Sequence, residues 1–94
     1  MYSKQVTIVN PTGLHARPAA DFCKKAAEFK SDIQIKRVTP PEKTMSGKSI
    51  IGVMAMGLAK DTTIQIIGDG GDEKEAVDTL VEMVEGGFGE IEIE

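Results

Sequence analysis

Four segments of the chain alternate apolar and polar residues, a pattern that is typical of strands with one buried face. Val6 and Ile8 show it near the start of the chain, and Ile64 and Ile66 show it again further along. The pattern predicts strands at residues 2–9, 33–38, 44–48 and 62–67.

Three other segments repeat their apolar residues at intervals of three and four, the spacing of a helix with one buried side. They predict helices at about residues 16–29, 49–56 and 72–85. Pro18 suits the first turn of the first helix, and Ser49 and Asp72 suit the N-cap positions of the other two. The apolar stripe of the first helix, the residues on its buried side, comprises Ala19, Phe22, Cys23, Ala26 and Phe29. The stripe of the third helix comprises Ala76, Val77, Leu80, Val81 and Val84.

The predicted elements follow the order β-α-β-β-α-β-α. Two packed layers would bury the apolar face of every strand and the stripe of every longer helix at once. We therefore predict an α+β open-faced sandwich, a four-stranded antiparallel sheet covered on one face by three helices. Residues 1–94 make a single domain, and residues 88–94 form a tail whose alternation suits either a strand or a frayed end.

Length and composition restrict the possible functions. A domain of 94 residues has one small core and no room for a deep catalytic cleft, which favours a carrier or a binding module. Hydrophobic residues make up 40% of the chain, and its longest apolar run, residues 50–59, is too short to cross a bilayer. We expect a cytoplasmic monomer that does not insert into membranes.

The single cysteine and single histidine exclude an internal disulfide and a standard structural zinc site. We therefore expect neither a metal nor a cofactor. Cys23 is either a small core residue or a redox site, and the core is favoured because no second cysteine or basic partner flanks it in a reactive motif.

The net charge of −4 is unevenly divided along the chain. Residues 1–64 hold ten Lys or Arg and five acidic residues, whereas residues 65–94 hold one Lys and ten acidic residues. A basic region could attract acidic partner proteins, although each of its lysines could equally be a plain solvated residue. This region comprises Arg17, Lys24, Lys25, Lys48 and Lys60. The acidic balance and the lack of tryptophan argue against nucleic acid as a partner.

The only histidine lies in residues 10–19, Asn-Pro-Thr-Gly-Leu-His-Ala-Arg-Pro-Ala, where a strand turns into a helix. Gly13 permits the sharp turn because it can adopt a positive φ, and His15 then falls at or next to the helix N-cap. A helix N-terminus disfavours a protonated imidazole and favours a bound anion. His15 is therefore a candidate nucleophile, whose phosphoryl group the amides and Arg17 would stabilise. On spacing alone, a surface residue or a weak cap remains the commoner interpretation of such a histidine.

Residues 13–19, Gly-Leu-His-Ala-Arg-Pro-Ala, resemble the active-site signature of the HPr family, the histidine-containing phosphocarriers of the bacterial sugar phosphotransferase system. The resemblance runs from the first predicted strand to the third helix and implies the same fold. It implies that His15 takes the phosphoryl group of phosphoenolpyruvate from enzyme I and passes it to enzyme IIA domains. Such a chain is a relay partner rather than a stand-alone enzyme. The residues around the phosphate would be Thr12, Ala16, Arg17 and Pro18.

Residues 48–54 resemble the regulatory serine segment of HPr proteins from Gram-positive bacteria, in which a kinase/phosphorylase modifies the serine. Ser49 is the matching position. The residues alone favour a plain helix N-cap, and the two interpretations are compatible. The connection at residues 37–43 is a few residues longer than the family's usual tight turn, which puts the register between the second strand and Ser49 in question.

A short second helix cannot bury all of its apolar side chains, because they lie on more than one face. Ile50, Ile51 and Met54 are therefore expected to form an adaptable docking surface near His15, unless all of them belong to the core.

Other functions remain open. One is a regulatory binding module whose Ser49 phosphoform controls a transcription factor, and another is a paralogue that serves a nitrogen-related relay. A purely structural domain would be favoured by a buried His15.

Overall fold

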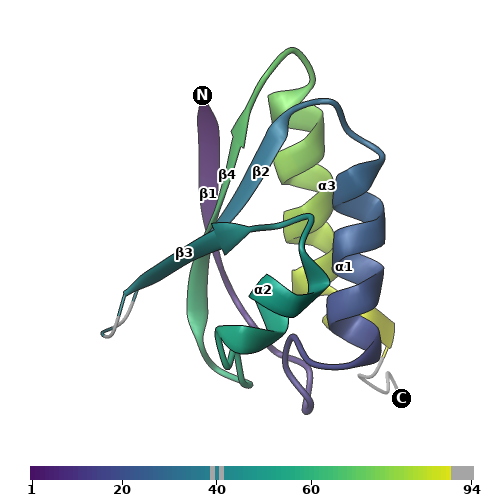
Figure 1. Ribbon diagram of the computed structural model, residues 1–94. Helices are drawn as coiled ribbons and strands as arrows, with labels where there is room; N and C mark the ends of the chain where they lie inside the picture. The colour runs from purple at the N-terminus through teal and green to yellow at the C-terminus, as the bar shows by residue number, and fades with distance from the viewer. Residues whose placement is uncertain (39, 41, 90–94) are drawn as a thin grey trace.

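The computed structural model describes residues 1–38, 40 and 42–89. Over these residues the chain forms four strands and three helices in the predicted order, followed by a short 3-10 turn (Figure 1). The elements are β1 Tyr2–Thr7, α1 Arg17–Ala27, β2 Asp32–Arg37, β3 Lys43–Ser46, α2 Ile50–Ala55, β4 Thr63–Asp69, α3 Glu73–Glu85 and η1 Gly87–Gly89.

The four strands make one antiparallel sheet in the order β1-β4-β2-β3. Val6 pairs with Ile64, and Ile35 pairs with Ile66, so the apolar residues of neighbouring strands share one face. The three helices lie against that face and leave the other face uncovered (Figure 1). The predicted open-faced sandwich is therefore confirmed.

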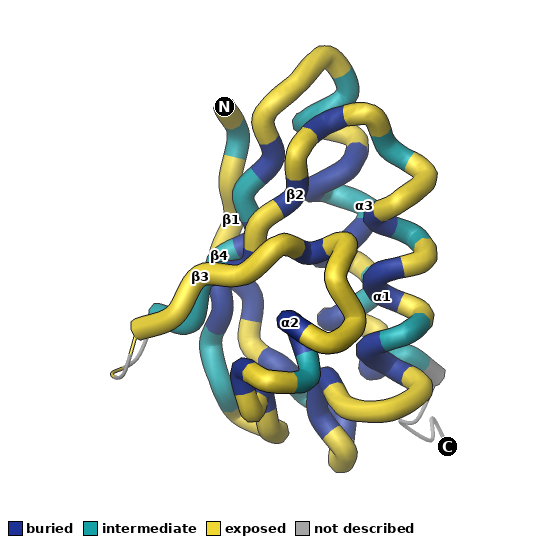
Figure 2. Tube along the Cα trace, viewed as in Figure 1, coloured by how far each residue is buried: buried dark blue, intermediate teal, exposed yellow. Residues whose placement is uncertain are grey.

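The core lies between the sheet and the helices. Buried positions recur along α1 and α3 and alternate with exposed ones along β2 (Figure 2), as the apolar stripes predict. Cys23 is buried among them, and its burial raises the pKa of its thiol, so its assignment to the core is confirmed. The largest fully buried apolar side chains are Phe22, Ile8, Leu14, Ile33, Ile35, Ile64, Ile66, Leu80, Val53, Val77 and Val84.

Three strands differ from their predicted lengths, and the first of them, β1, ends at Thr7 rather than at Val9. β4 continues to Asp69 because β2 offers pairing partners as far as Asp32, whereas the sequence predicted a strand that ends at Ile67. β3 ends at Ser46, because Gly47 and Lys48 form a turn there. The Gly47 amide donates to Ile33 O over 2.7 Å in that turn. The predicted tail begins within η1, at Phe88. Residues 90–94 of the tail lie outside the described part of the chain, as do residues 39 and 41 of the long connection.

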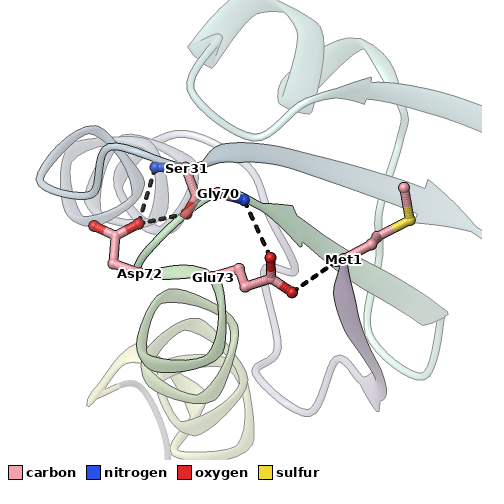
Figure 3. A network of polar contacts seen from close by, with 5 residues as sticks. All are labelled: Met1, Ser31, Gly70, Asp72 and Glu73. Carbon is pink, nitrogen blue, oxygen red and sulfur yellow. Dashed lines mark hydrogen bonds and ion pairs between the residues drawn. The ribbon is translucent and has the colours of Figure 1, made fainter.

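Asp72 holds two elements together instead of capping its own helix. It occupies the N-cap position of α3, but its side chain makes no cap hydrogen bond, so the predicted capping role is wrong. Its carboxylate accepts the amide of Lys30 over 2.9 Å. It also accepts the amide of Ser31, over 2.9 Å, and the Ser31 hydroxyl (Figure 3). These bonds, led by that of the hydroxyl, lower the pKa of Asp72 to about 2.

Glu73 completes this polar network. Its Oε1 accepts the amide of Gly70 over 3.2 Å, and its Oε2 lies 2.9 Å from the amino group of Met1 (Figure 3). The start of α3 is thus fastened both to the loop after α1 and to Met1, the residue before β1. This end of the domain lies away from the loop that precedes α1 (Figure 1).

Candidate functional site

The turn before α1 is held in shape by a buried asparagine. Asn10 Nδ2 donates to Gly13 O over 2.9 Å and to Thr12 Oγ1 over 3.4 Å, and the Gly13 amide donates back to Asn10 O over 3.1 Å. Asn10 is fully buried, so its bond to Gly13 O is shielded from water. The sequence did not predict this role, and its only signal was an asparagine followed by proline at a turn.

Gly13 brings this turn into contact with the loop that follows α2. Its φ is +68°, and a Cβ atom there would lie 2.2 Å from Leu58 O. The next residue, Leu14, donates its amide to the same carbonyl over 2.8 Å. A side chain at position 13 would therefore separate the two loops that meet beside His15.

Ala16 is the N-cap residue of α1 and has an unusual backbone conformation, with φ 51° and ψ −119°. The first helical hydrogen bond runs from the Ala20 amide to Ala16 O over 3.1 Å. The amides of the residues before Ala20 therefore donate to no helical carbonyl and are available to an anion. His15 lies one residue before the N-cap, as predicted, and Pro18 falls in the first turn, where its missing amide removes no helical hydrogen bond.

His15 is exposed, which argues against a purely structural role. It borders a shallow pocket of about 220 Å³ between the turn before α1 and the end of α2. The pocket is lined by Thr12, Leu14, His15, Met54, Gly57, Leu58 and Ala59. The structure thus brings two predicted site residues, Thr12 and His15, together with one predicted docking residue, Met54.

Arg17 extends into solvent from the first turn of α1. Its side chain is 93% exposed, and its Nε lies 4.0 Å from the carboxylate of Asp21, one turn further along the helix. An exposed pair at this distance contributes little to stability. The guanidinium can therefore turn toward an anion on His15 at small cost.

Ser49 is the N-cap residue of α2. Its Oγ accepts the amide of Gly52 over 3.1 Å, which confirms the capping role. The residue is also exposed and therefore open to modification.

The apolar side chains of α2 divide between the core and the surface. Val53 and Met56 are buried, whereas Ile50 is 44% and Ile51 83% exposed, and Met54 is half-buried. The prediction that a short helix must expose part of its apolar surface is confirmed. Met45 of β3, 36% exposed, was not predicted to be exposed, because alternation alone does not show that β3 is an edge strand.

Two members of the predicted basic region are already engaged within the domain. Lys48 Nζ donates to Phe29 O over 2.9 Å at the end of α1, and Lys25 Nζ lies 3.3 Å from Glu28 Oε1. Lys24 and Lys60 are exposed. The bond to a neutral carbonyl leaves the charge of Lys48 in place, so the exposed charges of the basic region include Arg17, Lys24, Lys48 and Lys60.

A sheet covered by three helices, with an exposed histidine before a helix N-terminus, is an arrangement suited to a carrier of phosphoryl groups. The family model for the PTS HPr component phosphorylation site matches residues 2–86. The chain belongs to the HPr family of phosphocarrier proteins.

Individual relatives agree with this assignment. The phosphocarrier protein HPr of Neisseria meningitidis serogroup A is 40% identical over 90 residues, which are 96% of this chain and 98% of the relative. The HPr-like protein Crh of Halalkalibacterium halodurans is 40% identical over 85 residues, 90% of this chain and 98% of the relative. The crystal structure of HPr-C-His from Thermoanaerobacter tengcongensis superimposes with a TM-score of 0.90 and 38% identity, covering 98% of this chain and all of that one.

Two further observations concern the described residues as a group. They contain no helix that is both long and apolar enough to span a membrane. They also contain no cluster of three or more His, Cys, Asp or Glu side chains placed to bind a metal ion.

Proposed function

We propose that His15 accepts a phosphoryl group from phosphorylated enzyme I and passes it to the enzyme IIA domains of sugar uptake systems. The observation that carries this proposal is the exposed imidazole one residue before the N-cap of α1, beside a pocket and close in sequence to an exposed Arg17. Membership of the HPr family supports it.

The transfer exchanges one bond to phosphorus for another. The lone pair of His15 Nδ1 attacks phosphorus, and the bond from phosphorus to the donor breaks as the new phosphorus–nitrogen bond forms. The donor keeps that electron pair. The Ala16 and Arg17 amides, the Arg17 guanidinium and the Thr12 hydroxyl then stabilise the bound dianion, and Pro18 keeps the first turn of α1 in place. The second transfer, to enzyme IIA, repeats the exchange with His15 as the leaving group.

Partners would dock on the surface around this histidine. Ile50, Ile51 and Met54 offer apolar contact area, and Arg17, Lys24 and Lys60 offer positive charge. Apolar contacts would supply most of the affinity, and complementary charge would mainly raise the association rate.

The deciding experiment is phosphoryl transfer from labelled phosphoenolpyruvate and enzyme I to the wild type and to His15→Ala. Because the chain has a single histidine, acid-labile label on the wild type but not on the variant identifies the site. An Arg17→Ala variant should take up label more slowly, because it lacks the side chain that stabilises the phosphoryl group. Absence of label on the wild type, with enzyme I active on another HPr, contradicts the proposal.

We further propose that phosphorylation of Ser49 by an HPr kinase/phosphorylase regulates the domain. Its exposure favours this role, as does the similarity to an HPr-like Crh, and the phosphoform could also bind a transcription regulator. A phosphate at the N-cap of α2 is compatible with the helix, so the added charge would mainly weaken docking of an apolar partner surface. Ser49→Asp keeps a capping oxygen and adds charge, whereas Ser49→Ala removes the cap without adding charge. A higher apparent KM for phospho-enzyme I in Ser49→Asp alone supports regulation, and equal values in both variants contradict it.

Three narrower expectations remain proposals. Size-exclusion chromatography tests whether the chain is a monomer, and cell fractionation tests whether it is cytoplasmic. Transfer to sugar-specific rather than nitrogen-related enzyme IIA domains distinguishes the sugar relay from the nitrogen branch.

A further inference from the structure

A side chain from the sheet reaches the carbonyl end of α2. Arg37, the last residue of β2, donates from Nη1 to Met56 O over 3.3 Å. Met56 is the C-cap residue of α2, and the helix has no basic residue of its own in its last turn. The positive charge that this helix end favours is therefore supplied by Arg37.

The position of this guanidinium is fixed and partly dehydrated. Arg37 pairs with Ile64 of β4 on one side and with Lys43 of β3 on the other, so its backbone is anchored in the sheet. The side chain is half-buried, and its Nε is buried with no hydrogen-bond partner among the described residues. Such an arrangement costs desolvation free energy, which the contact with Met56 O only partly offsets. An apolar side chain would fill this position without that desolvation cost, so the guanidinium indicates a more specific role.

The residues that follow Met56 lead directly to the candidate site. Gly57, Leu58 and Ala59 line the same pocket as His15. Leu58 O accepts the amide of Leu14, the residue next to His15, over 2.8 Å. A displacement of Met56 would therefore be transmitted through two residues of backbone to the hydrogen bond that positions the histidine.

We propose that Arg37 is a positioning residue for the phosphoryl relay. It fixes the end of α2 to the sheet and so keeps the Gly57–Ala59 segment of the pocket against the turn that carries His15. Arg37 acts through Met56 and does not touch the phosphoryl group. The functional part of this inference rests on the proposed phosphocarrier activity, whereas its structural part can be measured independently.

Amide hydrogen exchange tests the structural part. The variant Arg37→Met keeps a long apolar stem but removes the donor and the charge. Amide exchange at Leu14 and Gly57 should accelerate about tenfold in this variant, as expected for loss of one hydrogen bond from a charged group. Exchange at Ala76, whose amide donates to Asp72 O in α3, should keep its wild-type rate. Lys36→Met is the matched control, because it removes one charge from the neighbouring residue of β2, whose ammonium lies 3.4 Å from Glu42. Unchanged exchange at Leu14, or an equal acceleration at Leu14 and Ala76, overturns the proposal.

Phosphoryl transfer tests the functional part. At saturating phospho-enzyme I, the rate of label uptake should fall about threefold or more in Arg37→Met, stay at the wild-type level in Lys36→Met, and recover partly in Arg37→Lys, which can still donate. Equal rates in wild type and Arg37→Met overturn the positioning role. Failure of the wild type to take up label would instead reject the proposed function, and the exchange data would still decide whether Arg37 orders the pocket.

Discussion

The Leu14 amide donates a 2.8 Å hydrogen bond to Leu58 O, so the residue before the only histidine is fastened to the loop that follows α2. Gly13 makes this contact possible, because Leu58 O lies so close to it that a side chain at position 13 would collide with that oxygen. The candidate site is therefore formed by two loops that are more than 40 residues apart in the sequence. Changes in either loop should affect both.

Gly13→Ala should destabilise the domain strongly. The substitution combines a positive φ of 68° with a Cβ atom 2.2 Å from Leu58 O, and we expect the free energy of unfolding to fall by more than about 2 kcal/mol in urea titrations. Gly57→Ala is the control, since Gly57 has a φ of 63° but no atom within 4 Å of the added carbon. It should lose only about 1 kcal/mol. Equal losses would show that the close approach to Leu58 contributes nothing.

Ala16→Gly should leave the domain as stable as the wild type or more stable. Glycine removes the strain of φ 51° and ψ −119°, which is worth about 1–3 kcal/mol, but it adds unfolded-state entropy worth about 0.4–1 kcal/mol. The measurement is thermal or urea unfolding. Ala20→Gly, within α1, lacks the strain and should lose about 1 kcal/mol. A loss of the same size in Ala16→Gly would show that the backbone at Ala16 is not strained.

Asp72→Asn should remove a contribution to stability that depends on pH. The folded pKa of Asp72 is about 2 against an ordinary 3.8, so its contribution is fully present above pH 3.8 and is lost as the pH falls toward 2. The wild type should therefore be more stable than Asp72→Asn at neutral pH, and the difference should shrink between pH 4 and pH 2. Urea titrations over this range measure it. A difference in stability between the wild type and Asp72→Asn that stays constant from pH 4 to pH 2 would contradict the linkage.

Ser31→Ala should raise the pKa of Asp72, because the hydroxyl that donates to its carboxylate is lost. An NMR titration of the Asp72 carboxyl carbon measures this shift.

Ile51→Gln should weaken partner docking without destabilising the fold. The side chain is 83% exposed, so the free energy of unfolding should change by less than about 0.5 kcal/mol. The apparent KM for phospho-enzyme I should rise, because an apolar contact is lost. Val53→Ala, in the buried side of the same helix, should show the opposite result, a clear loss of stability with little change in KM. An unchanged KM in Ile51→Gln would exclude Ile51 from the docking surface.

Local patterns were sufficient to predict most of this fold. The alternation of Ile64 and Ile66, the stripe that includes Leu80 and the capping serine at Ser49 each depend on residues that are neighbours in the chain. The same holds for the turn at Gly13 and the place of His15 beside the N-cap, because turn chemistry and helix starts are local features. These features determined the fold class, the element order and the candidate nucleophile.

The tertiary structure alone decided the contacts between distant segments. Asp72 lies at a helix N-cap, yet its carboxylate binds the loop at Ser31, 41 positions away, because the packed elements bring two amides and a hydroxyl of that loop within hydrogen-bond distance. Lys48 binds Phe29 O, and Arg37 binds Met56 O, for the same reason. A side chain with several possible partners binds those that the packed elements bring within hydrogen-bond distance. The periodicity of the sequence does not predict which partners these are.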